Sequence, residues 1–186
     1  MSKIGLFYGS ETGNTRKVAK SIVKKLGEDV VELFNVSKAT ADDVAKFSSL
    51  ILATPTLGDG ELVDSWKTFF PTFEGIDLTG KTVAIFGFGD QDAYGHEFVD
   101  AMIILYEAAK KQGATIIGSW PTDDYDFSKS KSVVDGEFVG LALDGPHAVS
   151  AGVDALLVTA EVWPLAAVQD EVAQFMGNGE PLTLCG

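Results

Sequence analysis

The stretch from residue 10 to residue 15 holds the side chains whose types and spacing most directly suggest a ligand. It lies between the apolar run 4–8 and a helical pattern that begins near Arg16. The unpaired amides of a helix's first turn and the helix dipole favour an anion at such a place. Hydroxyl donors and a glycine allow close contact with a phosphate. The six residues are Ser10, Glu11, Thr12, Gly13, Asn14 and Thr15.

The same six residues differ from two common phosphate loops and also have a simpler interpretation. No Lys follows a second Gly, as the loop for nucleoside triphosphates requires, and the three glycines of the dinucleotide fingerprint are absent. Hydroxyl residues and Asn also cap helices that bind nothing. The stretch by itself therefore indicates either a site for one terminal phosphate or a helix cap without a ligand.

The composition limits the classes of function that the chain can have. With 186 residues, 46% of them hydrophobic, the chain suits a single domain over residues 1–186. Its net charge of −13 argues against nucleic acid and membrane partners and favours a partner with a basic patch. The single cysteine, Cys185, is compatible with a reducing compartment. We therefore expect a cytoplasmic protein, or a plastid protein from which a transit peptide has been removed.

Strand and helix patterns alternate along the first two thirds of the chain. Apolar runs predict strands at 3–8, 30–34, 49–53, 81–86 and 114–119, and helical patterns begin near Arg16, at 41–46, around Trp66 and at 98–111. This alternation predicts a doubly wound α/β fold, a five-stranded parallel sheet in the order 2-1-3-4-5 between two helical layers.

The predicted strand order places a ligand site at one edge of the sheet. The order reverses between the first and third strands, and ligands bind at the carboxyl ends of the strands beside such a reversal. The loops 10–15, 54–60 and 87–95 meet there, and all three are rich in glycine, hydroxyl or acidic residues. This agreement favours the phosphate interpretation of the first loop over the cap without a ligand.

Four stretches in register resemble the long-chain members of the flavodoxin family. Residues 10–15 match the family's hydroxyl-x-Thr-Gly-x-Thr phosphate loop, and residues 54–62 and 86–94 resemble its two flavin loops. Residues 124–144 resemble the insertion that splits the last strand in long-chain members. The resemblance implies non-covalently bound FMN and electron transfer between redox enzymes, with neither a catalytic residue nor a metal.

The resemblance also implies roles for single positions. The stretch 10–15 is expected to hold the FMN phosphate. The residues expected around the flavin ring are Pro55, Thr56, Leu57, Gly58, Asp59 and Gly60 on its inner face and N5 edge, Phe88, Gly89 and Asp90 on its pyrimidine side, and Tyr94 on its outer face.

Elementary chemistry is consistent with these roles. Tyr94 is an unusual aromatic residue for a loop rich in Gly and Asp, and it would gain by stacking on a flat ring. The Gly58–Asp59 peptide can rotate and offer its carbonyl to the protonated N5 of a singly reduced flavin, although a plain Gly-Asp turn is the alternative. We expect an acidic rim that opposes a second, anionic reduction, made of Asp59, Glu61, Asp64, Asp90, Asp92 and Glu97. Trp66 and Trp120 are expected in the core or at its rim, and His96 on the surface.

Three positions and the tail depart from the family pattern. Leu57 stands where many long-chain members have Trp, Glu97 where Asn is frequent, and Pro146 where some members have an Asp that contacts the ribityl chain. Residues 145–186 show little resemblance. Helical spacing on both sides of Pro164 predicts a closing helix and a further helical segment there.

Two other functions occur on related folds. An FMN-dependent NAD(P)H:quinone oxidoreductase needs a pocket over the flavin, and no insertion follows the strand 81–86 to build one. A receiver domain of a response regulator needs acidic residues after the first strand and an Asp after the third, where Ser10 and Pro55 stand.

We therefore predict a monomeric, low-potential one-electron carrier. It would take electrons from an NADPH-dependent flavodoxin/ferredoxin reductase or another donor. It would pass them to an acceptor enzyme with a basic docking face. The quinone oxidoreductase remains the alternative.

Overall fold

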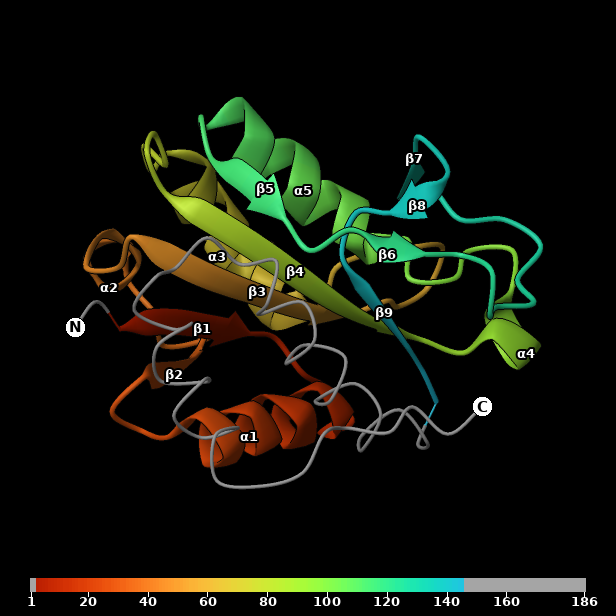
Figure 1. The fold of residues 1–186 in the computed structure, drawn as a ribbon, viewed down its shortest axis with the longest axis horizontal. Coiled ribbons are helices and arrows are strands. Elements are labelled where there is room, and N and C mark those ends of the chain that lie inside the picture. The colour runs from red at the N-terminus through yellow and green to blue at the C-terminus, as the bar shows by residue number, and fades with distance from the viewer. Residues whose placement is uncertain (1–2, 146–186) are drawn as a thin grey trace, which may run out of the picture.

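The computed structural model describes residues 3–145, which form a parallel sheet between two layers of helices (Figure 1). The predicted helical tail lies outside the described residues. The main sheet has the predicted order β2-β1-β3-β4-β5, with a further strand, β9, paired to β4. Its strands are β1 (Ile4–Tyr8), β2 (Val31–Asn35), β3 (Ser49–Pro55), β4 (Thr82–Gly89), β5 (Thr115–Ile117) and β9 (Leu141–Asp144).

Residues that alternate along each strand pack into two separate cores. Ile4 and Leu6 of β1 face α1 (Asn14–Leu26), which contributes Val18 and Ile22 to that core. Phe7 faces the opposite side, where α2 (Ala41–Ala45), α3 (Asp64–Glu74) and α5 (Ala101–Lys111) pack. Because both faces are covered, the central strands are apolar throughout, as parallel strands require. None of the helices in the described part of the chain is both long and apolar enough to cross a membrane.

Trp66 anchors α3 in the second core. Its side chain is fully buried, and its indole Nε1 donates a hydrogen bond to the Ala53 carbonyl at 2.8 Å. The prediction that Trp66 belongs to the core is therefore confirmed, and Trp120 is partly buried at the edge of both cores.

The strand predicted last in the sheet is split into two, as expected. β5 pairs with the first part of β4 and β9 with its last part, both in parallel: Ala84 is opposite Ile117, and Phe86 is opposite Leu141. Between them, residues 118–140 form an insertion. The insertion carries a small antiparallel sheet in the order β6-β8-β7, made of β6 (Trp120–Pro121), β7 (Val133–Val134) and β8 (Glu137–Phe138).

Two predicted boundaries differ from the structure by three residues, and each difference has a tertiary cause. β4 continues to Gly89 into the predicted loop 87–95, because β3 and β9 supply partners on its two sides as far as Phe88 and Gly89. The rest of that loop includes the short helix α4 (Gln91–Tyr94). The helix predicted to begin at Phe98 begins at Ala101, because Val99 adopts a positive φ of 51° that no helix accepts.

Gly140 lets the insertion return to the sheet at the start of β9. A methyl group added there would overlap the Ile85 backbone carbonyl of β4, which cannot move aside as a flexible side chain could. By contrast, a methyl group at Gly75 would meet nothing closer than 3.5 Å, and its φ of −82° suits any residue.

We expect Gly140→Ala to lower the free energy of unfolding by about 1–3 kcal/mol, the usual cost of overpacking. Urea denaturation would measure it. Gly75→Ala is the matched control, which should be neutral or slightly stabilising because it reduces the freedom of the unfolded chain. Equal stability of the two variants would contradict the close approach at Gly140.

Candidate functional site

Three loops leave the carboxyl ends of β1, β3 and β4 at one edge of the sheet. The register places Tyr8 of β1 opposite Ala53 of β3, and Pro55 of β3 opposite Phe88 of β4. The loop residues that follow these strands therefore lie next to one another. This is the arrangement that the strand order predicts, and it brings together the three stretches that the sequence singles out.

The first loop presents backbone amide groups at the amino end of α1. Gly13, the residue before the helix, has a φ of 92°, and its amide donates to Ser10 Oγ at 3.1 Å. The other amides of this loop donate no hydrogen bond to any of the described residues. They are those of Glu11, Thr12, Asn14 and Thr15. Unpaired amides at a helix terminus are a ready site for an anion. No acidic residue follows in the first turn, where Arg16 and Lys17 are exposed.

The second loop is a tight hairpin with a fixed base and an open tip. Leu57 and Glu61 exchange two backbone hydrogen bonds, and Gly58 at the exposed tip has a φ of 49°. A methyl group at Gly58 would have no contact closer than 3.9 Å, so the tip has room to change its conformation. The base is held by Thr56, whose amide donates to the Phe88 carbonyl at 2.9 Å.

The third loop carries an aromatic ring that the protein leaves uncovered. Asp90 caps α4 by accepting hydrogen bonds from the amides of Asp92 (3.1 Å) and Ala93 (2.9 Å). Tyr94, at the end of this helix, is 58% exposed, and it is the large hydrophobic side chain most open to solvent in residues 3–145. An exposed ring at the end of a capped, fixed turn is available to stack on a flat ligand.

Asp144, at the end of β9, ties the third loop to the sheet. Its two carboxylate oxygens accept hydrogen bonds from the Gln91 backbone amide at 2.9 Å and from Gln91 Nε2 at 2.7 Å. The Gln91 Oε1 accepts in turn from the Asp126 amide at 2.7 Å. Gln91 is therefore a structural residue of the site that the sequence analysis did not single out, because its partners are distant in the sequence.

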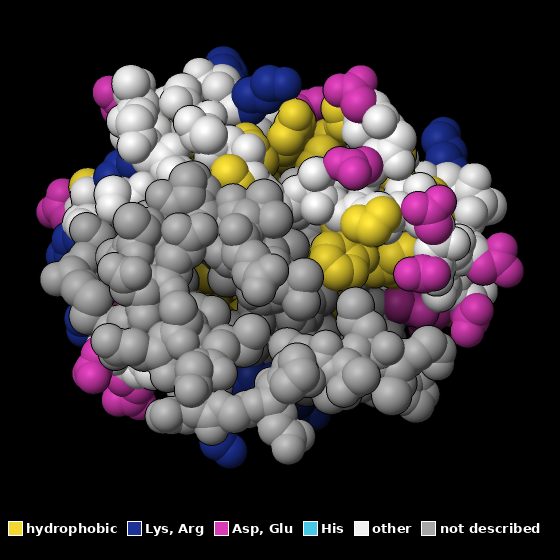
Figure 2. Space-filling view, in the orientation of Figure 1, with side chains coloured by type: hydrophobic (Ala, Val, Ile, Leu, Met, Phe, Trp, Pro, Cys, Tyr) yellow, Lys and Arg dark blue, Asp and Glu magenta, His cyan; other side chains and the backbone are white. Residues whose placement is uncertain are grey.

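Carboxylates surround the loops, and most of the predicted acidic rim is exposed. On the face shown in Figure 2, Asp and Glu side chains gather on the side where α4 lies in Figure 1. Five of the six predicted residues are exposed: Asp59, Glu61, Asp64, Asp90 and Asp92. The prediction is wrong for Glu97, which is only 8% exposed, with His96 Nε2 3.5 Å from Glu97 Oε1. His96 itself is exposed, as expected.

Two groups near the site have shifted ionisation. The Lys67 ammonium, hydrogen-bonded to Glu61, lowers the pKa of that carboxyl, so Glu61 stays charged beside the second loop. Burial raises the pKa of the Tyr125 phenol, whose hydroxyl donates to the Ala142 carbonyl of β9 at 2.7 Å. Tyr125 is therefore neutral at physiological pH and acts as a hydrogen-bond donor between the insertion and β9.

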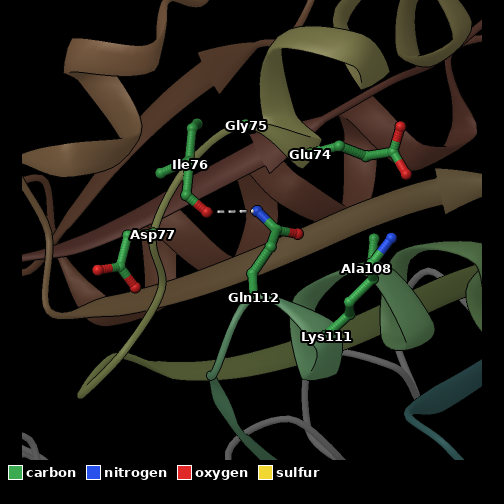
Figure 3. A pocket seen from close by; sticks show the side chains of 7 residues that line it. All are labelled: Glu74, Gly75, Ile76, Asp77, Ala108, Lys111 and Gln112. Carbon is green, nitrogen blue, oxygen red and sulfur yellow. Dashed lines mark hydrogen bonds between the residues drawn. The ribbon is translucent and has the colours of Figure 1, made fainter.

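A separate pocket of about 290 Å³ lies between the carboxyl ends of α3 and α5 (Figure 3). Gln112 spans it and donates from Nε2 to the carbonyls of Phe73 (2.6 Å) and Ile76 (2.9 Å). Its lining residues are Glu74, Gly75, Ile76, Asp77, Ala108, Lys111 and Gln112. These helices run opposite to the strands, so the pocket lies at the amino edge of the sheet and is not part of the candidate site.

Comparison with known proteins gives a consistent result. Residues 6–147 match the protein-family model described as Flavodoxin. The chain is 49% identical over 145 residues to a flavodoxin from Synechocystis sp., covering 77% of this chain and 85% of that protein. It is 45% identical over 145 residues to flavodoxin 1 of Escherichia coli, covering 77% and 82%. The solved structure of Fusobacterium nucleatum flavodoxin bound to flavin mononucleotide aligns with a TM-score of 0.78 and 29% identity, over 97% of this chain and all of that one.

Proposed function

This chain belongs to the flavodoxin family, and we propose that the three loops at the carboxyl edge of its sheet hold FMN for low-potential electron transfer. As a flavodoxin it is an FMN-dependent one-electron carrier rather than an enzyme, and it exchanges electrons with redox partners. Relatives that are named flavodoxins do not favour the quinone oxidoreductase alternative.

The assignment of the phosphate rests on the amides of the first loop. At the amino end of α1 the amides of Glu11, Thr12, Asn14 and Thr15 have no acceptor within residues 3–145. The same stretch carries the hydroxyl side chains of Ser10, Thr12 and Thr15. A phosphate would satisfy these donors and would also meet the positive end of the helix dipole. Arg16 and Lys17 add positive charge in the same turn. We infer that residues 10–15 bind the FMN phosphate.

The other two loops suit the two faces of a flat ring. The exposed Tyr94 would cover the outer face and the half-buried Leu57 the inner face, through contact without ring stacking. Phe88, Gly89 and Asp90 would meet the pyrimidine side, and Gly58–Asp59 the N5 edge. Bound FMN supplies the electron chemistry, and this chain's residues bind it, orient it and set the charge around it.

The proposed site predicts a yellow protein that changes colour in two steps. The apoprotein should bind added FMN in equimolar amount, and stepwise reduction should pass through a blue, singly reduced form before the colour fades. A visible spectrum at each step measures this. Failure of the apoprotein to bind FMN would contradict the proposal. Oxidation of NADPH without a reductase would instead favour the quinone oxidoreductase.

The open tip of the second loop generates a prediction for Gly58. Val at this position would resist the positive φ and limit rotation of the 58–59 peptide. We expect Gly58→Val to lower the maximum yield of the blue form in a redox titration. Gly136→Val is the matched control, because Gly136 also has a positive φ (89°) and open surroundings but lies in the hairpin between β7 and β8. Equal yields in the two variants would contradict a role for the 58–59 peptide.

The acidic rim defines the proposed docking face for a reductase or acceptor with a basic surface. We infer that a monomer of this chain docks in the cytoplasm, or in the plastid stroma, through the side that carries Asp59, Asp90 and Asp92.

Rates of electron transfer from an NADPH-dependent reductase should fall as salt rises, because salt screens the attraction. Asp92→Asn should weaken this salt dependence. Asp29→Asn should leave it unchanged, because Asp29 is exposed at the opposite edge, between α1 and β2. Stopped-flow rates over a salt series measure both, and rates that do not change with salt would contradict steering by charge.

A further inference from the structure

Asp100 is a buried carboxylate that the proposed function does not use. It directly precedes α5 and is 2% exposed. Its Oδ1 accepts a hydrogen bond from the Lys131 backbone amide at 2.6 Å, and its Oδ2 lies 3.4 Å from Lys131 Nζ. A buried carboxylate is costly unless it is paired. The partner of Asp100 is Lys131, which belongs to the insertion, so the insertion stabilises this buried charge.

The same carboxylate packs against the second loop. A methyl group at Gly60 would lie 2.8 Å from Asp100 Cβ and 3.0 Å from its Oδ2, so the backbone at Gly60 rests directly on Asp100. At the other end of the loop, Thr56 Oγ1 accepts a hydrogen bond from the Ala101 amide at 3.2 Å. Residues 100 and 101 therefore support both ends of the stretch that includes Gly58 and Asp59.

The insertion also holds the backbone just before Asp100 in an unfavourable conformation. Val99 has a φ of 51°, which a β-branched residue adopts only when its surroundings impose it. Ser132 Oγ donates to the Val99 carbonyl at 2.8 Å and accepts from the Ile103 amide at 3.0 Å. Ser130 Oγ donates to the Phe98 carbonyl at 2.6 Å. The turn that supports the second loop is thus fixed by the segment 130–132.

Aromatic packing also fixes the turn that precedes α5 against the insertion. Phe98 contacts three rings of the insertion, with centroid distances of 5.7 Å to Tyr125, 5.8 Å to Phe127 and 5.8 Å to Phe138. The insertion thus contacts both Phe98 and Asp100, and Asp100 contacts Gly60 of the second loop. A displacement of Lys131 or Ser132 would therefore reach the second loop.

We propose that Asp100 and Lys131 form a positioning pair through which the insertion sets the conformation of residues 56–60 and, with it, the first one-electron potential of bound FMN. This inference rests on the proposed function, which places Gly58–Asp59 at the N5 edge of the ring. Neither residue is a catalytic residue, because both act through the loop. In this proposal the insertion influences the potential of bound FMN, although it lies outside the three loops of the site.

Two variants with opposite changes of charge separate positioning from electrostatics. Asp100→Asn removes a negative charge and Lys131→Met removes a positive one, and both break the pair. If the pair positions the loop, both variants destabilise the singly reduced form relative to the oxidised form, by at least about threefold. That change lowers the first potential by about 28 mV, because a tenfold change corresponds to about 59 mV for one electron. A through-space effect of charge would instead shift the two variants in opposite directions.

Lys129→Met is the matched control. It makes the same change of charge two residues away, on an exposed side chain. Its first potential should stay at the wild-type value, and Lys131→Arg, which keeps a cation for Asp100, should restore most of the value lost in Lys131→Met. Spectroelectrochemical titration measures all the potentials. Urea denaturation of each apoprotein identifies any variant that fails to fold, and Lys131→Arg then provides the comparison with the wild type.

The outcomes distinguish this inference from the proposed function. If the wild-type apoprotein does not bind FMN, the proposed function fails. If FMN binds to every variant and the potentials of Asp100→Asn and Lys131→Met either equal that of Lys129→Met or move in opposite directions, the positioning pair is overturned and the FMN site stands.

Discussion

The parallel ladder between β3 and β4 is the interaction on which the site depends. It runs from Ser49 opposite Thr82 to Pro55 opposite Phe88, and the Thr56 amide extends it by one bond to the Phe88 carbonyl. The ladder fixes where the second and third loops leave the sheet. Because β1 pairs with the other side of β3, the first loop (residues 10–15) is placed by the same strand. A shift of register in β3 would separate all three loops at once.

β4 can extend this far because its outer edge is covered by two different strands. β5 pairs with its first part, and β9 with its last part after the chain has passed through the insertion. The end of β9 then delivers Asp144 to Gln91, and the insertion delivers Lys131 to Asp100. Splitting the last strand therefore provides two tethers at the carboxyl edge that one continuous strand would not supply.

Charge is distributed unevenly around the site. The carboxylates of the second and third loops are exposed, and in the proposed function their field would attract a basic partner and oppose a second, anionic reduction. The helix that follows the first loop has the opposite character, because α1 contains no acidic residue. Its basic residues are Arg16, Lys17, Lys20, Lys24 and Lys25. The net charge of −13 is therefore unevenly distributed: the carboxylates of the second and third loops would attract a basic surface, and the basic helix α1 would attract an acidic one.

The sequence by itself determined the fold class, the strand order and the three site loops, because these depend on local signals. Hydrophobic periodicity identifies each strand and helix, and strand order then places Ser10–Thr15, Gly58 and Tyr94 at one edge. Only the tertiary structure decided the end of β4, the start of α5 and the burial of Glu97. It also decided the tethers, since Gln91–Asp144 and Lys131–Asp100 join residues 53 and 31 positions apart. No local pattern encodes such contacts, because they arise when separate elements pack together.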